Sequence, residues 1–183
     1  MKKMLLLLFA FLVLSSAVYA YSPDSSYVAL YADTLRSGWR VNRGGGAVTP
    51  FELWIWWLPS VRGIRAAEFR IIYPTSVIQG TVTASDSLSI QFGTLPNGMA
   101  VSWIYCQHDW AWSHHQDIYL KDANPAQIMV STSNASGKLQ IVWCPPVGAP
   151  IEPVRKWNNF CLNYDCGTAV HSRSWGAIKD LYK

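Results

Sequence analysis

The chain has 183 residues and a formal net charge of +4, and its Lys and Arg residues are scattered rather than clustered. A weak and dispersed positive charge argues against a nucleic-acid-binding surface. Ten Trp and nine Tyr residues form a surplus that must either pack in a core or contact a ligand.

Residues 1–20 carry the three parts of a secretory signal peptide. Lys2 and Lys3 precede an apolar run from Met4 to Leu14, and small residues lead to a cleavage position after Ala20. This run is too short to span a membrane, and no later stretch comes closer to the roughly twenty apolar residues required. We expect export to the periplasm, the cell surface or the medium, with no transmembrane segment in the mature chain.

Alternation of apolar and polar residues predicts a series of short strands in the mature chain. In order they are 27–32, 51–58, 66–73, 77–84, 88–92, 99–105, 118–120, 127–133 and 139–143. The turn at Asn97 and Gly98 predicts one hairpin, and the turn from Asn134 to Gly137 predicts a second. No helical pattern separates these strands. The sequence therefore predicts an all-β fold, an antiparallel immunoglobulin-like sandwich over residues 21–173.

The chain has four cysteines, Cys106, Cys144, Cys161 and Cys166. An even number of cysteines in a chain exported to an oxidising compartment predicts disulfide bonds. Four cysteines allow three pairings. We favour Cys106 with Cys144, because each ends a strand-like run, and Cys161 with Cys166, because they lie close in sequence. Zinc binding is the competing interpretation, but the sequence has no CxxC pair. The prolines that follow Cys144 predict an extended connection without strands.

The last ten residues, 174–183, predict a short amphipathic helix. Ser174 is a suitable N-cap, and one side of the helix carries Trp175, Ile178, Leu181 and Tyr182. Ten residues alone do not hold a helix in water. The segment is expected either to dock on the sandwich or to be a tail that a sorting or anchoring partner recognises.

Three stretches carry a family resemblance. Leu30 to Asp33, Phe51 to Ile71 and the ending Ser174 to Tyr182 resemble a group of uncharacterised exported bacterial proteins. That group shares a signal peptide, one cysteine-containing β-domain and a Thr/Ser-Trp-Gly-x-Ile-Lys-x-Leu-Tyr tail. Ala66 to Ile71 is also similar to a strand of cohesin-like sandwiches. The resemblance implies the fold and export, and it implies no activity, cofactor or catalytic residue.

The densest polar cluster runs from Cys106 to Asp117 and is predicted to be a loop. Its candidate metal ligands are His108, His114, His115 and Asp117, since imidazole and carboxylate groups together suit zinc or copper. The alternative that we favour is a solvated loop, because adjacent histidines on an extended chain point to opposite sides.

Two pairs of tryptophans are candidate contacts for a ligand. Trp54 and Trp56 lie on one side of their strand, about 6 to 7 Å apart, a spacing at which aromatic rings line a sugar-binding platform. A central strand that is covered on both faces would have the same pattern. Trp110 and Trp112 stand beside charged residues and are better candidates for exposed contacts.

Enzyme motifs are missing from the sequence. It contains no Gly-x-Ser-x-Gly, no carboxylate pair that spacing identifies, and no phosphate-loop lysine after Gly44 to Gly46. We therefore predict a non-catalytic structural or interaction domain without a cofactor, whose partner is a protein or a polysaccharide. A carbohydrate-binding module is the first alternative, and a metal-binding protein is the second.

Overall fold

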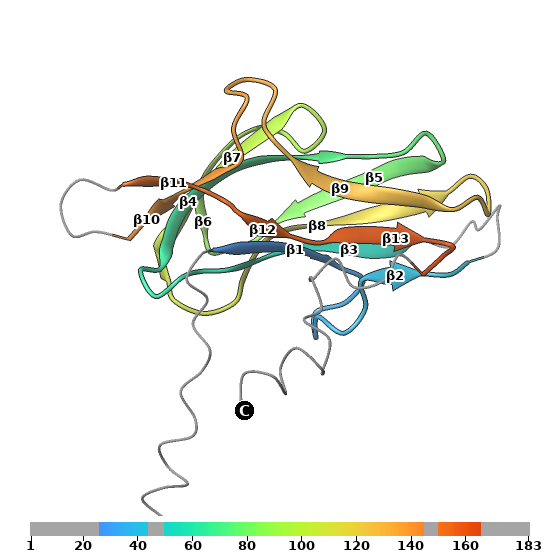
Figure 1. The fold of residues 1–183 in the computed structure, drawn as a ribbon, viewed down its shortest axis with the longest axis horizontal. Helices are drawn as coiled ribbons and strands as arrows, with labels where there is room; N and C mark the ends of the chain where they lie inside the picture. The colour runs from blue at the N-terminus through green and yellow to red at the C-terminus, as the bar shows by residue number, and fades with distance from the viewer. Residues whose placement is uncertain (1–25, 44–49, 145–149, 166–183) are drawn as a thin grey trace, which may run out of the picture.

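The computed structural model describes residues 26–43, 50–144 and 150–165, in which all the regular structure is β-strand (Figure 1). The strands are β1 (Tyr27–Tyr31), β2 (Arg40–Val41), β3 (Phe51–Leu58), β4 (Ile64–Ile72), β5 (Val77–Ala84), β6 (Leu88–Thr94), β7 (Gly98–Gln107), β8 (Ala111–Leu120), β9 (Ala126–Ser131), β10 (Gln140–Trp143), β11 (Ile151–Pro153), β12 (Lys156–Trp157) and β13 (Asn159–Leu162). They form two sheets around one apolar core, so the predicted all-β sandwich is confirmed. These ranges contain no helix that is long and apolar enough to cross a membrane.

The first sheet has the order β12-β1-β3-β8-β5, with β3 at its centre. β3 runs antiparallel to both β1 and β8. Its side chains alternate as predicted, because Leu53, Ile55 and Trp57 are fully buried in the core between the sheets. Trp54 and Trp56 therefore point to the outer face of this sheet.

The second sheet is organised around β4, whose two edges have different neighbours. β7 pairs with one edge, and β6 pairs with β7. Along the other edge, β10 pairs with β4 as far as Glu68, and β9 pairs with it from Arg70 to Ile72. β9 and β10 thus follow one another as a single strand, interrupted where residues 132–139 leave the sheet.

The next strand position in the sheet, beside β9 and β10, is also interrupted at the same place along the sheet. β11 pairs with β10, and β13 pairs with β9 and with β2. Between β11 and β13 the chain crosses to the first sheet, where β12 pairs with β1 in parallel. Asn158 fixes this crossing, because its buried side chain accepts from the Leu30 N–H at 2.6 Å and donates to the Leu30 carbonyl at 3.0 Å.

Aromatic side chains fill much of the core. Trp57 packs edge-on against Phe69 and Trp103, with ring centroids 5.2 and 6.1 Å apart. The Trp57 indole N–H donates to the Ser113 hydroxyl at 3.1 Å, which satisfies the polar atom that this large ring brings inside. Part of the tryptophan surplus is therefore structural.

The two predicted hairpins have different outcomes. The hairpin of β6 and β7 is confirmed, and its turn uses Gly98 at a φ of 141°, a value that favours glycine. The hairpin expected for 127–133 and 139–143 is wrong, because β9 and β10 pair with β4 and not with each other. Both strands are shorter than β4, and together they pair along most of it.

The loop expected from Cys106 to Asp117 is also wrong. β7 continues to Gln107 and β8 begins at Ala111, so only residues 108–110 connect the two strands. The polar residues of this segment fit a strand because the inward ones find hydrogen-bond partners in the core. The connection after Cys144, expected to lack strands, contains β11, β12 and β13. The predicted signal peptide and the predicted helix at 174–183 lie outside the described residues.

Candidate interaction surfaces

An aromatic cluster covers the outer face of the first sheet around Trp54. The Trp54 ring lies 4.5 Å from His115 in a stacked arrangement, 5.0 Å from Trp112 edge-on and 6.3 Å from Trp56. Its indole N–H donates to the Glu52 carboxylate at 2.9 Å. These rings shield one another, so Trp54 and Trp56 are only 9% and 8% exposed although they are on the outer face.

Arg36 extends this cluster from the loop that follows β1. Its guanidinium carbon lies 4.8 Å from the centroid of Trp56 and 4.9 Å from that of Trp110, so the cation is held between two indole rings. Arg36 adopts a φ of 59°, which is uncommon for a residue with a side chain. The Asp33 carboxylate holds the loop by accepting hydrogen bonds from the Ser37 amide and hydroxyl at 3.0 and 2.8 Å.

The tryptophans expected to contact a sugar all belong to this aromatic cluster. The Trp54 and Trp56 centroids are 6.3 Å apart, which agrees with the spacing predicted along a strand. Because both rings are nearly buried, the accessible aromatic surface of the cluster belongs to the half-buried Trp110 and Trp112. A polysaccharide contact at Trp110 and Trp112 stays a prediction.

The four candidate metal ligands do not converge. His114 points into the core and is fully buried, whereas His115 and Asp117 are only partly buried and His108 is exposed at the turn between β7 and β8. The His114 Nε2 lies 3.0 Å from the Gln91 side-chain oxygen of β6, so this contact joins the two sheets. Burial, with a smaller contribution from the neighbouring His115, lowers the pKa of His114 to about 4. The ring is therefore neutral at pH 7.

The favoured disulfide between Cys106 and Cys144 is present and joins the end of β7 to the end of β10. His108 lies beside it. Within the described ranges, these three residues are the one group of three potential metal ligands whose ligand atoms lie within 4.8 Å of one another. Both sulfur atoms are committed to the disulfide, which leaves His108 as the single ligand. Cys161 is also disulfide-bonded. Its expected partner, Cys166, lies outside the described residues.

A second surface, which the sequence did not reveal, lies on the outer face of the second sheet. Two cross-strand rows run from β6 to β11: Phe92, Ala100, Glu68, Gln140 and Pro153 form one, and Ile90, Ser102, Ala66, Val142 and Ile151 form the other. Three of the large side chains in these rows are exposed: Phe92 by 70%, Ile151 by 63% and Ile90 by 51%. We call this surface the apolar face.

A β-bulge explains why alternation alone did not identify the apolar face. Regular alternation places Leu88, Ile90 and Phe92 on one side of their strand. The register of β6 against β7 shifts between Leu88 and Ile90. Leu88 therefore packs against the core, while Ile90 and Phe92 turn outward.

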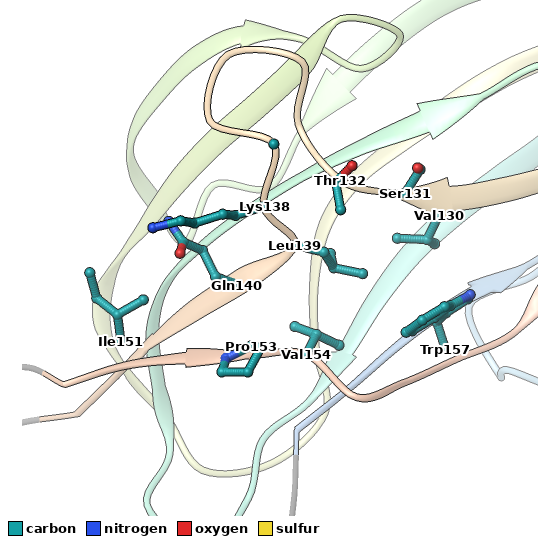
Figure 2. A pocket seen from close by; sticks show the side chains of 11 residues that line it. Val130, Ser131, Thr132, Lys138, Leu139, Gln140, Ile151, Pro153, Val154 and Trp157 are labelled. Atoms are coloured by element: carbon teal, nitrogen blue, oxygen red, sulfur yellow. The ribbon is translucent and has the colours of Figure 1, made fainter.

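A groove of about 710 Å³ lies where the strands β9/β10 and β11/β13 are interrupted (Figure 2). Its floor contains the buried side chains of Leu139 and Val154. Val130 to Thr132 line one wall, and Trp157, which is 42% exposed, lines the other. At one end the groove meets the apolar face, because Ile151 and Pro153 belong to both.

Comparison with known proteins places the fold but not the function. No protein-family model matches the chain, and no curated protein is similar to it in sequence. A cohesin module from a Clostridium perfringens family 33 glycoside hydrolase has a TM-score of 0.52 at 10% identity, covering 73% of this chain and 92% of that one. A type I cohesin from Pseudobacteroides cellulosolvens has a TM-score of 0.50 at 9% identity, covering 82% and 98%.

A third cohesin of similar fold was solved with a bound partner. It comes from scaffoldin B of Acetivibrio cellulolyticus, in complex with a mutant Cel5 dockerin, and has a TM-score of 0.50 at 14% identity, covering 77% of this chain and 99% of that one. At identities this low the likeness concerns the fold alone. The chain is therefore a two-sheet sandwich of cohesin-like fold.

Proposed function

We propose that the mature chain is an exported, non-catalytic interaction domain that binds a protein partner through the apolar face. The observation that carries this proposal is the exposure of Phe92, Ile90 and Ile151 on one side of one sheet. Single exposed apolar residues are ordinary, but one sheet face that exposes several of them together with polar side chains is typical of a protein interface. Glu68 and Gln140, hydrogen-bonded to each other at 2.9 Å, supply polar groups in the middle of the face.

The shape of the apolar face also suits a protein partner. Neighbouring strands are about 4.8 Å apart, so the rows from β6 to β11 extend roughly 19 Å across the sheet. An open sheet face of this extent accommodates a sheet or helix of another protein better than it encloses a small ligand. The cohesin-like fold supports the proposal as an analogy, since a solved cohesin of this fold holds a dockerin.

A capture experiment tests the proposed function. Residues 21–183 are immobilised and exposed to the exported proteins of the source organism, beside an Ile90→Thr/Phe92→Thr variant. Ile78→Thr is the matched control, because Ile78 is 50% exposed on β5 of the other sheet. We expect one protein to bind the wild type and the control and to be lost from the double variant. Equal capture by all three would contradict the proposal.

The carbohydrate-binding alternative has its own observation, the half-buried rings of Trp110 and Trp112 around Arg36. Indole faces are suited to sugar contacts as well as to cations. A polysaccharide pull-down with the wild type and a Trp110→Ala/Trp112→Ala variant distinguishes the two functions. Retention that the tryptophan variant abolishes would favour the carbohydrate-binding module, and no retention by either chain would remove it.

A further inference from the structure

The groove beside the apolar face has an open strand edge. The ladder between β9 and β13 ends at the pair Met129 and Asn159, because the chain then crosses to the first sheet. Val130 and Ser131 pair with β4 on their other side and have no ladder partner toward the groove. The backbone N–H and C=O of Thr132 form no hydrogen bond with any described residue.

The backbone geometry turns these groups toward the groove. The Ile71 N–H donates to the Leu95 carbonyl at 2.7 Å, on the β7 side of β4, so Ile71 directs its polar groups away from β9. The pair of Ile71 and Val130 is therefore a non-hydrogen-bonded pair of the antiparallel ladder. Val130 directs its own polar groups to the opposite side. Directions along an extended chain repeat every second residue, so the N–H and C=O of Thr132 point to the same side as those of Val130.

The opposite wall and the floor are apolar. Trp157 lies across the groove from Val130, and Leu139 and Val154 lie beside this pair, further along the groove (Figure 2). A volume of about 710 Å³ is within the range of pockets that hold drug-sized ligands. The groove can therefore receive at least one large apolar side chain from a segment that lies along the open edge.

The rim of the groove is positively charged. Lys138 lines it, and Arg155 and Lys156 are exposed in the segment that carries Val154 and Trp157. The groove and its rim are formed by residues 130–132, 137–140 and 151–157. Glu152 is the single carboxylate in these ranges. Lys138, Arg155 and Lys156 form no salt bridge with any described carboxylate. The rim complements a negatively charged segment.

We propose that this groove binds an extended, acidic segment of a partner protein by strand addition. The segment pairs with the backbone of Thr132, inserts an apolar side chain between Trp157 and Val130, and places a carboxylate near Lys138 or Lys156. This inference rests on the proposed role as an interaction domain, and it adds the class of peptide that such a partner presents. The recognised chemistry is a carboxylate next to a large apolar side chain in an extended chain.

Selection from a displayed library of random dodecapeptides tests this proposal. We expect the sequences that bind residues 21–183 to be enriched in Asp or Glu beside Phe, Trp, Leu or Ile. A synthetic peptide of the most enriched sequence should shift the amide resonances of Val130 to Thr132 and the indole N–H resonance of Trp157. Enriched peptides without carboxylates, or resonance shifts confined to another surface, would overturn the proposal.

Matched variants separate the three contacts. Thr132→Pro removes an N–H that has no partner among the described residues. We expect it to weaken binding of the peptide about tenfold, while Thr132→Ala does not. Lys138→Glu should weaken peptide binding by a similar factor. Lys121→Glu is the matched control, because it makes the same change at an exposed residue after β8, and it should leave binding unchanged. Trp157→Ala should abolish measurable binding. Equal affinity of Thr132→Pro and Thr132→Ala for the peptide would contradict strand addition.

The outcomes also distinguish the groove from the apolar face. Peptide binding that Ile90→Thr/Phe92→Thr leaves unchanged and Thr132→Pro weakens supports the groove, even if no protein is captured through the apolar face. Capture of a protein partner that depends on Ile90 and Phe92, with no peptide selected at Thr132, would leave the proposed function standing and reject the groove. Thermal unfolding of each variant confirms that the fold is retained.

Discussion

His114 is a fully buried histidine that connects the two sheets through Gln91. Its Nδ1 has no hydrogen-bond partner among the described residues, so a protonated ring would bury an uncompensated charge. The structure keeps this imidazole neutral, and its pKa is lowered from 6.5 to about 4. Because the pKa of His114 differs between the folded and unfolded states, the stability of the fold depends on pH.

This shift predicts a loss of stability in mild acid. The unfolded state takes up the proton near pH 6.5 and the folded state near pH 4, so stability is fully present above pH 6.5 and falls as the pH drops toward 4. A shift of this size corresponds to roughly 3 kcal/mol. Urea unfolding at a series of pH values measures it. His114→Gln should flatten the dependence between these values, and the exposed control His108→Gln should not; parallel curves for all three proteins would contradict the assignment.

Arg36 illustrates how a strained residue is held by its neighbours. Its positive φ costs about 1 kcal/mol relative to glycine, and the contacts with Trp56 and Trp110 offset that cost. We expect Arg36→Ala to destabilise the fold by about 1 to 2 kcal/mol, because the ring contacts are lost and the strain remains. Arg36→Gly should be more stable than Arg36→Ala by about 1 kcal/mol. Unfolding in guanidinium chloride measures both variants. If the backbone strain were absent, Arg36→Ala would be more stable than Arg36→Gly.

At the scale of elements, the disulfide is the longest-range covalent link in the described part of the chain. Cys106 and Cys144 are 38 residues apart, and closing a loop of this length is worth about 4 kcal/mol on the chain-entropy model. The Cys106→Ala/Cys144→Ala variant should therefore unfold at a clearly lower denaturant concentration in oxidising buffer. Unchanged unfolding of that variant would mean that the link does not restrict the unfolded chain.

Gly63 provides an independent test of the packing around this disulfide. A Cβ at position 63 would lie 2.7 Å from the Cys144 sulfur and 2.8 Å from the His108 ring, at a φ of 72°. Gly63→Ala should destabilise the wild type by more than about 1 kcal/mol, because both the contact and the φ are unfavourable. The loss should be smaller in the Cys106→Ala/Cys144→Ala background, where the sulfur is gone. Double-mutant unfolding measurements check this, and equal losses in the two backgrounds would exclude the clash.

Local signals in the sequence predicted the elements that follow regular rules. The alternation in β3 and β4 and the turn before Gly98 each specify a strand or a hairpin through neighbouring residues. The joint pairing of β9 and β10 with β4 could not be predicted in this way, because it depends on the length of a distant strand. The strands in residues 151–162 were missed for a related reason: their pairing partners lie far away in the sequence, and prolines precede them.

The candidate site was predicted even less completely. The sequence identified the tryptophans of the aromatic cluster, but their mutual shielding arises from three segments that meet on one face. The apolar face depends on a single bulge beside Leu88, and a shift of one residue reverses which side of a strand faces the core. The groove exists because two strand interruptions coincide. These features are tertiary, so alternation within one strand does not reveal them.

For the whole molecule, two outer faces of different character follow from the sandwich. Around Trp54, the outer face of the first sheet is covered by its own aromatic rings and Arg36, whereas the apolar face of the second sheet leaves Phe92 and Ile90 exposed. Burying a side chain of this size on binding contributes about 1.5 to 3 kcal/mol. We therefore expect the second sheet to provide binding and the aromatic rings of the first sheet to provide stability.

The affinity of the captured partner for four matched proteins tests this assignment most directly. Isothermal titration should give the wild type and Ile78→Thr the same dissociation constant, with Trp110→Ala/Trp112→Ala close to both. Loss of two apolar contacts of about 1.5 kcal/mol each should weaken Ile90→Thr/Phe92→Thr by a factor on the order of 100. A partner that binds this variant as tightly as the wild type, and is lost with Trp110 and Trp112, would contradict the account.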